Sequence, residues 1–427
     1  MHGRRESEPV DGSAGPGVRS QARTAVRKLA AGRLVSLTGT YAATIALAYS
    51  IYQQTRSTAW VAATMVLTFG AAGAFGPVAG AIGDRFDRRR VMILAEVGAA
   101  ACWGLVAVVA DVPPLLVALA CLASLFEALF VPASSAAIPN LAGDDHLAWA
   151  NSLIAIGRYA GLTVGPLIGG LLFVAVGPRW VFVVNAASFL VSAALVATVR
   201  GNFTDSNRPA EEAFEPMGLA AGFRYVARER VLRWMLLSWV VFVLGTATTI
   251  IAEPVLADEF GVGSLGYGLL TACWGGGTIV GAWLSRGVRE DREALWIVSF
   301  SGLMALTCFG VALSPWFWLI LVWVTAFGLA DGPTQVVEQN LLQRRTPDAV
   351  RGRVMGAWEA MMQLAFVIAL LVGGVVVSAV GPKGAFLLGG VTGLMGTALL
   401  FPLLRWLPGR RSPEEHVAGP EPANTES

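Results

Sequence analysis

Long apolar runs alternate with short polar segments along most of the chain. Each run holds roughly 20 residues, the length that an α-helix needs to cross about 30 Å of hydrocarbon. Because backbone groups inside a bilayer must bond within their own segment, these runs are predicted to be helices. Twelve spans are predicted, at residues 34–53, 59–83, 91–110, 114–138, 151–175, 179–199, 234–254, 264–285, 294–313, 315–339, 354–378 and 384–406. The predicted fold class is therefore an all-α polytopic membrane protein.

The positions of the basic residues support this number of spans. With the N-terminus inside, all 31 Lys and Arg residues except Arg56, Arg158, Arg179 and Lys383 fall in tails or loops on the cytoplasmic side. This asymmetry follows the positive-inside rule, and losing one span would scramble it. Both termini are therefore predicted to be cytoplasmic. Arg outnumbers Lys by 29 to 2, which indicates a GC-rich bacterial genome and thus a multi-pass protein of the bacterial cytoplasmic membrane.

The composition argues against a soluble enzyme. The chain is 55% hydrophobic and 14% charged, whereas about a quarter of the residues of a soluble protein are charged. The basic loops are interpreted as orientation signals and contacts with anionic membrane lipid, not as a nucleic-acid-binding surface. The three histidines lie in tails or a loop, so no metal site is expected in the bilayer. No Gly-Lys-Ser/Thr motif occurs, so neither nucleotide binding nor a cofactor is expected.

The chain repeats itself weakly about a polar linker. Gly80–Arg85 matches Gly281–Arg286 at an offset of 201, and Gly177-Pro178 matches Gly381-Pro382 at an offset of 204. Close helix packing could explain glycines singly, but not their repetition in register. The predicted domains are a disordered cytoplasmic tail at 1–33, six-helix bundles at 34–199 and 234–407, a cytoplasmic linker with an amphipathic helix at 200–233, and a second tail at 408–427.

The segment between the second and third spans combines a carboxyl group with several guanidinium groups. It resembles the loop between helices 2 and 3 of the major facilitator superfamily of secondary transporters, whose pattern Gly-x-x-x-Asp-Arg-x-Gly-Arg-Arg/Lys is met by Gly80, Asp84, Arg85, Arg88 and Arg89. Asp87 stands where the family has its second glycine. The resemblance implies two pseudo-symmetric six-helix bundles that rock about a midplane site. It also implies a gating role for this motif, with Asp84 at the start of helix 11, where the helix dipole favours negative charge.

The fifth span carries a second motif. Gly161, Gly165, Pro166, Gly169 and Gly170 resemble the antiporter motif Gly-x-x-x-Gly-Pro-x-x-Gly-Gly of drug and metabolite exporters in the same superfamily. The family's further glycine upstream is Ser152 here. Glycines make a flat helix face and Pro166 bends the helix, so two helices can seal tightly and limit leak. The resemblance, which covers about residues 30–407, is strongest to the branch that exports macrolides and siderophores.

Three charged residues lie inside predicted spans and are candidates for proton coupling. Glu127 and Asp331 correspond at the offset of 204 and lie near the middle of the bilayer. A carboxyl group at that depth faces water or is paired, and in isolation it tends to stay protonated. Arg158 of the fifth span is the predicted partner of Glu127, pairing with it in one state and separating from it in another. The alternative is that these groups form buried ion pairs that only fix helix packing.

The substrate cavity should hold polar and aromatic side chains. The candidates include Tyr41, Tyr49, Gln53, Asn185, Trp239, Gln335, Gln339, Trp358 and Glu359. The leading hypothesis is a monomeric exporter of a small amphipathic organic compound, such as a drug, an antibiotic or a siderophore-like metabolite, in exchange for protons. The alternative is a facilitator or symporter that takes up a small metabolite. A membrane-embedded enzyme is disfavoured because the spans lack a metal-binding or nucleotide-binding motif.

Overall fold

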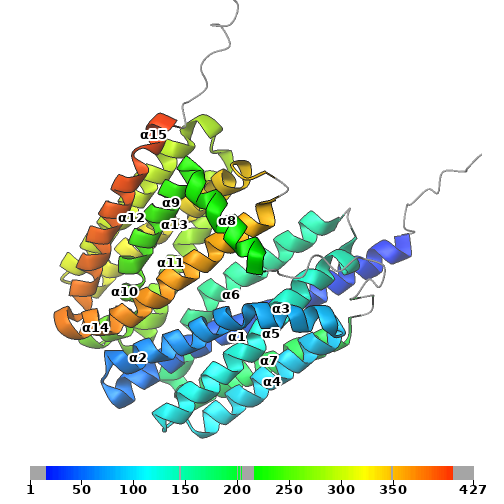
Figure 1. Ribbon diagram of the computed structural model, residues 1–427. Coiled ribbons are helices and arrows are strands. Elements are labelled where there is room, and N and C mark those ends of the chain that lie inside the picture. Colours follow the sequence, from blue (N-terminus) through cyan, green and yellow to red (C-terminus); the bar gives the residue numbers. More distant parts are fainter. Residues whose placement is uncertain are drawn as a thin grey trace, which may run out of the picture. The chain divides into compact units, whose positions relative to one another are not determined.

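The computed structural model describes residues 16–143, 146–199, 201, 203, 216–347 and 350–406 (Figure 1). Nearly all of the described backbone is helical, and no strand occurs in it. The predicted tail at 408–427, the first part of the tail at 1–33 and residues 204–215 of the predicted linker lie outside the described residues.

The helices follow the predicted spans closely. In the first half they are α1 (Pro16–Thr55), α2 (Thr58–Met65), a π-helical turn (Val66–Gly70), α3 (Ala71–Arg85), α4 (Arg88–Val108), α5 (Pro113–Ala142), α6 (Leu147–Val176) and α7 (Pro178–Ala197). In the second half they are α8 (Pro216–Arg228), α9 (Arg230–Thr246), α10 (Thr248–Glu259), α11 (Gly263–Leu284), α12 (Glu293–Leu313), α13 (Phe317–Arg344), α14 (Arg351–Leu400) and α15 (Leu403–Trp406), with short 3₁₀ turns at Ser285–Gly287 and Glu290–Arg292.

Ten segments of the described chain are long and apolar enough to cross a membrane. The predicted span at 264–285 is not among them, but it forms the 22-residue helix α11. The last segment, Arg351–Trp406, is too long for one crossing and is broken at Gly381. The protein is therefore an all-α multi-pass membrane protein, and its helices are consistent with the twelve predicted spans.

The break at Gly381 repeats a turn found in the first half. Gly177 has φ 85° and ψ 167°, and Gly381 has φ 73° and ψ 174°. Each is followed by a proline that begins the next helix, where a missing N–H costs nothing. A positive φ of this kind favours glycine, because a Cβ would clash with the backbone. The predicted correspondence between Gly177-Pro178 and Gly381-Pro382 is thus a correspondence of backbone conformation.

The chain divides by packing into two compact units. The first falls within Met1–Thr44, Ala71–Gly165 and Ala175–Ala213, and the second within Ile45–Gly70, Pro166–Val174 and Phe214–Ser427. The second half of α1, the segment α2 with the π-helical turn, and a short stretch of α6 thus pack with the C-terminal helices. The predicted bundles at 34–199 and 234–407 stay a prediction, because this division follows packing and not the sequence repeat.

Each unit has its own apolar core. In the first unit α4 packs against α5 and α7, and buried side chains such as Met92, Phe130 and Val196 meet there (Figure 1). In the second unit α14 packs against α9, α10 and α12, and α11 packs along α13. Helix α8, which falls in the predicted amphipathic segment, lies against α14. These two cores position the charged groups described next.

Candidate functional site

Glu127 lies inside the first unit, on α5, where two helices supply donors to its carboxyl group. The Thr40 hydroxyl of α1 donates to one oxygen at 3.3 Å, and the Trp103 indole N–H of α4 donates to the other at 3.3 Å. Close helix packing brings α4 to this position, since the ring of Phe126 on α5 lies against Gly98 of α4. The carboxyl group is therefore held between α1 and α4 by two neutral donors.

Arg158, the predicted partner of Glu127, is not its partner in this structure. Arg158 is exposed, and among the described residues no ion pair joins it to Glu127. The cation within electrostatic range of Glu127 is instead Arg33 of α1. Its guanidinium lies 5.1 Å from the ring centroid of Phe130, one helical turn along α5 from Glu127. The role predicted for Arg158 in another state stays a prediction.

Asp331 forms the corresponding group of the second unit. It is 8% exposed, and one of its carboxylate oxygens, Oδ2, accepts three hydrogen bonds. The donors are Trp274 Nε1 at 3.2 Å, Thr278 Oγ1 at 3.3 Å and Gln335 Nε2 at 2.9 Å. No hydrogen bond to Oδ1 is present in the described part of the chain. Asp331 is thus oriented by neutral donors, as Glu127 is.

Close backbone contact between α11 and α13 creates this arrangement. Gly328 and Gly332 of α13 meet backbone atoms of Trp274, Thr278 and Ala282 so closely that a Cβ would overlap them. Gly277 of α11 meets the carbonyl oxygen of Thr325, where a Cβ would lie at 2.5 Å. Small residues four apart let two helices approach in lipid. The approach brings Trp274 and Thr278 within hydrogen-bond reach of Asp331.

The predicted cavity residues fall into two groups. Gln335, Gln339 and Glu359 are exposed, and Tyr41 is half-buried beside Gly165. Asn185, Trp239 and Trp358 are buried in helix packing: Asn185 faces Gly39 of α1, Trp239 stacks edge-on against Phe242, and Trp358 donates to Glu338 at 2.8 Å. Their predicted contact with substrate stays a prediction.

The arginines of the gating motif fasten helix ends within the first unit. Arg88 donates to the carbonyl oxygen of Ala136 at 2.9 Å, and Arg89 donates to that of Ala197. Asp87, which replaces a family glycine, caps α4 by accepting from the N–H of Arg90 at 2.8 Å. Arg85 is exposed, and no atom of the described chain lies within 4 Å of a Cβ built at Gly80. The Asp84 side chain lies outside the described part of the structure, so its predicted contact is not tested.

The glycines of the fifth-span motif contact two different helices. A Cβ at Gly161 would lie 3.1 Å from the Thr38 nitrogen, and one at Gly165 would lie 2.6 Å from the Thr38 oxygen, both on α1. Further along α6, a Cβ at Gly170 would lie 2.7 Å from the Ser264 oxygen of α11. Pro166 stands within the same helix, and Gly169 is buried. The motif thus forms a flat face that allows close backbone contact, as its glycines predicted.

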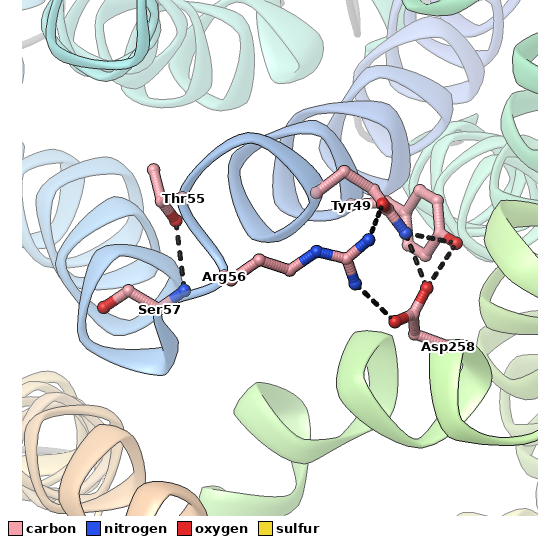
Figure 2. A network of polar contacts seen from close by, with 6 residues as sticks. Tyr49, Thr55, Arg56, Ser57 and Asp258 are labelled. Carbon is pink, nitrogen blue, oxygen red and sulfur yellow. Dashed lines mark hydrogen bonds and ion pairs between the residues drawn. The ribbon is translucent and has the colours of Figure 1, made fainter.

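A ring of polar contacts ties the end of α1 to the end of α10 within the second unit (Figure 2). Arg56 donates to Asp258 at 2.6 Å and to Gln53 at 2.7 Å, and Gln53 donates to Asp258 at 2.6 Å. The Tyr49 hydroxyl lies 3.2 Å from Asp258 and accepts from Gln53 at 2.8 Å. We call these four residues the α1–α10 latch. Tyr49 and Gln53, predicted as cavity residues, lie in this ring.

The latch also holds a strained residue. Arg56 has φ 51°, a conformation that non-glycine residues rarely adopt outside special sites. Its hydrogen bond to Asp258 and the negative charge of that carboxylate raise the pKa of Arg56 above its ordinary value. The guanidinium therefore stays charged at physiological pH. Nothing in the sequence pattern pointed to Asp258, because its partner lies about 200 residues away in the chain.

Replacing Asp258 with asparagine should loosen the turn at Arg56. The asparagine keeps an acceptor oxygen but removes the charge that holds the strained arginine. We expect several-fold faster hydrogen exchange of amides around residues 55–60, because local opening costs less free energy. Asp111→Asn is the matched control, since it removes a comparable exposed ion pair with Arg179 elsewhere. Unchanged exchange around Arg56 in Asp258→Asn would contradict a holding role for the latch.

Comparison with known proteins decides the family. The sequence matches the profile of the transmembrane secretion effectors over residues 20–422. The chain belongs to this family of the major facilitator superfamily. As a family member it is 30% identical to YfiS of Bacillus subtilis (strain 168), an uncharacterised MFS-type transporter, over 74% of this chain and 77% of YfiS. It is 27% identical to the enterobactin exporter EntS of Escherichia coli O1:K1 / APEC, over 79% of this chain and 81% of EntS.

Solved structures agree with the fold of the family. A bacterial homologue of the iron transporter ferroportin, solved in an inward-facing state, superposes with a TM-score of 0.69 at 16% identity, covering 92% of this chain and all of that chain. The nucleoside transporter NupG superposes with a TM-score of 0.68 at 15% identity, covering 90% and 99%. At these identities the likeness shows the fold alone. This secretion effector is thus a membrane transporter and not an enzyme.

Proposed function

We propose that this transporter exports a small amphipathic organic compound, such as a siderophore-like metabolite, a drug or an antibiotic, by alternating access. Two observations support export: the relatives include enterobactin exporters, and the sequence carries the exporters' fifth-span motif. The observation that carries the proposal is the packing of that motif. Gly161 and Gly165 bring α6 into backbone contact with α1, and Gly170 brings it into backbone contact with α11. Such contacts seal a pathway against leak, which an exporter working against a gradient requires.

Proton exchange is the proposed driving force. Glu127 and Asp331 are carboxyl groups inside spans, each held by neutral donors and neither joined to a cation by a close ion pair in the described chain. A carboxyl group in such a setting can gain or lose a proton when a cation, water or substrate arrives. The proposal places the protein in the bacterial cytoplasmic membrane as a monomer, with both termini inside, anionic lipid at its basic loops and the Asp84 motif as the cytoplasmic gate.

The test is a proton-flux assay in liposomes. Purified protein would be reconstituted into vesicles loaded with a pH-sensitive dye, and a panel of amphipathic drugs and siderophores, enterobactin included, would be added. We expect proton movement that requires both a compound and Glu127, so Glu127→Gln should abolish the signal. Glu253→Gln is the matched control: it removes another span carboxyl group, on α10, and should leave the signal unchanged.

The other outcomes of this assay are also decisive. Compound flux without a proton signal would contradict proton coupling and leave facilitated diffusion or another coupling ion. Proton-driven accumulation of the compound in the same direction as the protons would contradict export and favour uptake by symport. A proton signal in Glu127→Gln equal to that of the wild type would remove Glu127 from the coupling machinery.

A further inference from the structure

A buried carboxyl group in the first unit lacks the partners that its burial requires. Glu96 on α4 is 1% exposed, and in the described chain neither of its oxygens accepts a hydrogen bond of normal geometry. The Ser192 hydroxyl of α7 faces this carboxyl group but is also without a hydrogen-bond partner. A charged carboxylate left in this condition would cost several kcal/mol. Glu96 must therefore carry a proton or share a nearby positive charge.

The nearby charge is Arg33. Arg33 of α1 lies within electrostatic range of both Glu96 and Glu127. Its guanidinium lies over the ring of Phe130 on α5, and Phe130 packs in the same core cluster as Ala95, the neighbour of Glu96. No close ion pair fixes Arg33 to either carboxyl group in the described structure. The arginine is therefore placed between two candidate partners and bound to neither.

The helix registers show how the three groups are layered. Arg33 and Thr40 are seven residues apart on α1, and Glu96 and Trp103 are seven apart on α4, so each pair shares one helix face about 10 Å apart. Thr40 and Trp103 both donate to Glu127. Glu127 therefore lies at the level of Thr40 and Trp103, and Glu96 and Arg33 lie two turns nearer the N-terminal ends of α1 and α4. The long arginine side chain can reach toward either carboxyl group.

We propose that Arg33, Glu96 and Glu127 form one proton-binding site that holds a single shared proton. One guanidinium balances one carboxylate, so the second carboxyl group of the pair has to be neutral. The proton resides on Glu96 when Arg33 pairs with Glu127, and on Glu127 when Arg33 pairs with Glu96. The site deepens the proposed proton coupling and rests on it for its role in transport, but the shared proton itself can be tested without any substrate.

The other charged groups near this site do not supply a second counter-charge. Tyr41 of α1 is a neutral phenol, and Arg158 of α6 acts on Arg33 as a like charge. On α4 itself, Arg88 and Arg89 are engaged with the carbonyl oxygens of Ala136, Phe203 and Ala197. Arg33 is thus the cation that the two carboxyl groups have in common.

Infrared spectroscopy of the purified protein at neutral pH tests the shared proton, because a protonated carboxyl group has its own carbonyl stretching band. Glu96→Gln and Glu127→Gln should each remove the same one-group intensity, since the remaining carboxylate then pairs with Arg33. The double variant should lose no more than either single variant. Arg33→Gln should gain one group of intensity, and should gain nothing in the double-variant background.

Additive losses in the double variant, or no loss in Glu96→Gln, would overturn the shared site. Glu253→Gln is the additivity control, because its loss, if any, should add to that of Glu96→Gln. Both glutamine replacements preserve side-chain volume, so the test stands even where Arg33→Gln fails to fold. A liposome assay without proton flux combined with the non-additive infrared pattern would refute the proposed coupling and leave the shared proton intact. The reverse pair of results would refute the shared proton alone.

Discussion

Adding a single methyl group at Gly332 should destabilise the transporter more than any other small substitution considered. A Cβ at this position would overlap the Thr278 oxygen and the Ala282 nitrogen, which are backbone atoms of a neighbouring helix and cannot rotate away. Gly332→Ala must therefore push α11 from α13. Overpacking of this kind costs about 1–3 kcal/mol or more, which exceeds the gain of up to about 1 kcal/mol from replacing a helical glycine.

Thermal unfolding of the purified protein measures this effect. Gly104→Ala on α4 is the matched control, because no atom of the described chain lies within 4 Å of a Cβ built there. The control should be unchanged or slightly more stable, whereas Gly332→Ala should unfold at a lower temperature. Equal unfolding temperatures for Gly332→Ala and the wild type would show that α11 and α13 are not in backbone contact in the native protein.

The fold could be predicted from the sequence because its signals are local. Apolar runs set the helices, and the Gly-Pro pairs at 177 and 381 set two turns of the same conformation. Boundaries within helices were less visible: α11 is rich in glycine and therefore less apolar than its neighbours, yet it forms a full-length helix. Its glycines reflect backbone contact with α13, a property of packing that hydropathy does not report.

The site could be predicted only in part, since pairing between distant helices leaves little local trace. The depth of Glu127 and Asp331 in their spans pointed to both residues. Their partners were not predicted: Trp103 and Thr40 hold Glu127, and Trp274, Thr278 and Gln335 hold Asp331. Arg158 was the cation nearest in sequence, whereas Arg33 is the cation near in space. Asp258 of the latch carried no signal, because an acidic residue at the end of a span is ordinary.

A pair of substitutions at Asp331 should separate its structural role from a role in coupling. Asp331→Leu removes the acceptor for three donors, of which Thr278 is buried and Trp274 is half-buried. Each buried donor left unpaired costs about 1–3 kcal/mol, so we expect a loss of several kcal/mol in unfolding free energy and no transport. Asp331→Asn keeps an oxygen that accepts from Trp274, Thr278 and Gln335, and its stability should stay close to that of the wild type.

Transport by the asparagine variant then decides the role of the carboxyl group. If Asp331 gains and loses a proton during the cycle, Asp331→Asn should fold normally and lose compound-driven proton flux in the liposome assay. If Asp331 only orients α11 against α13, the same variant should transport as the wild type does. Glu338→Gln provides the comparison on the same helix, since it also preserves an acceptor for a tryptophan, the indole of Trp358. Loss of flux in Asp331→Asn together with retained flux in Glu338→Gln would assign the coupling role to the carboxyl group of Asp331 and not to acidity of α13 in general.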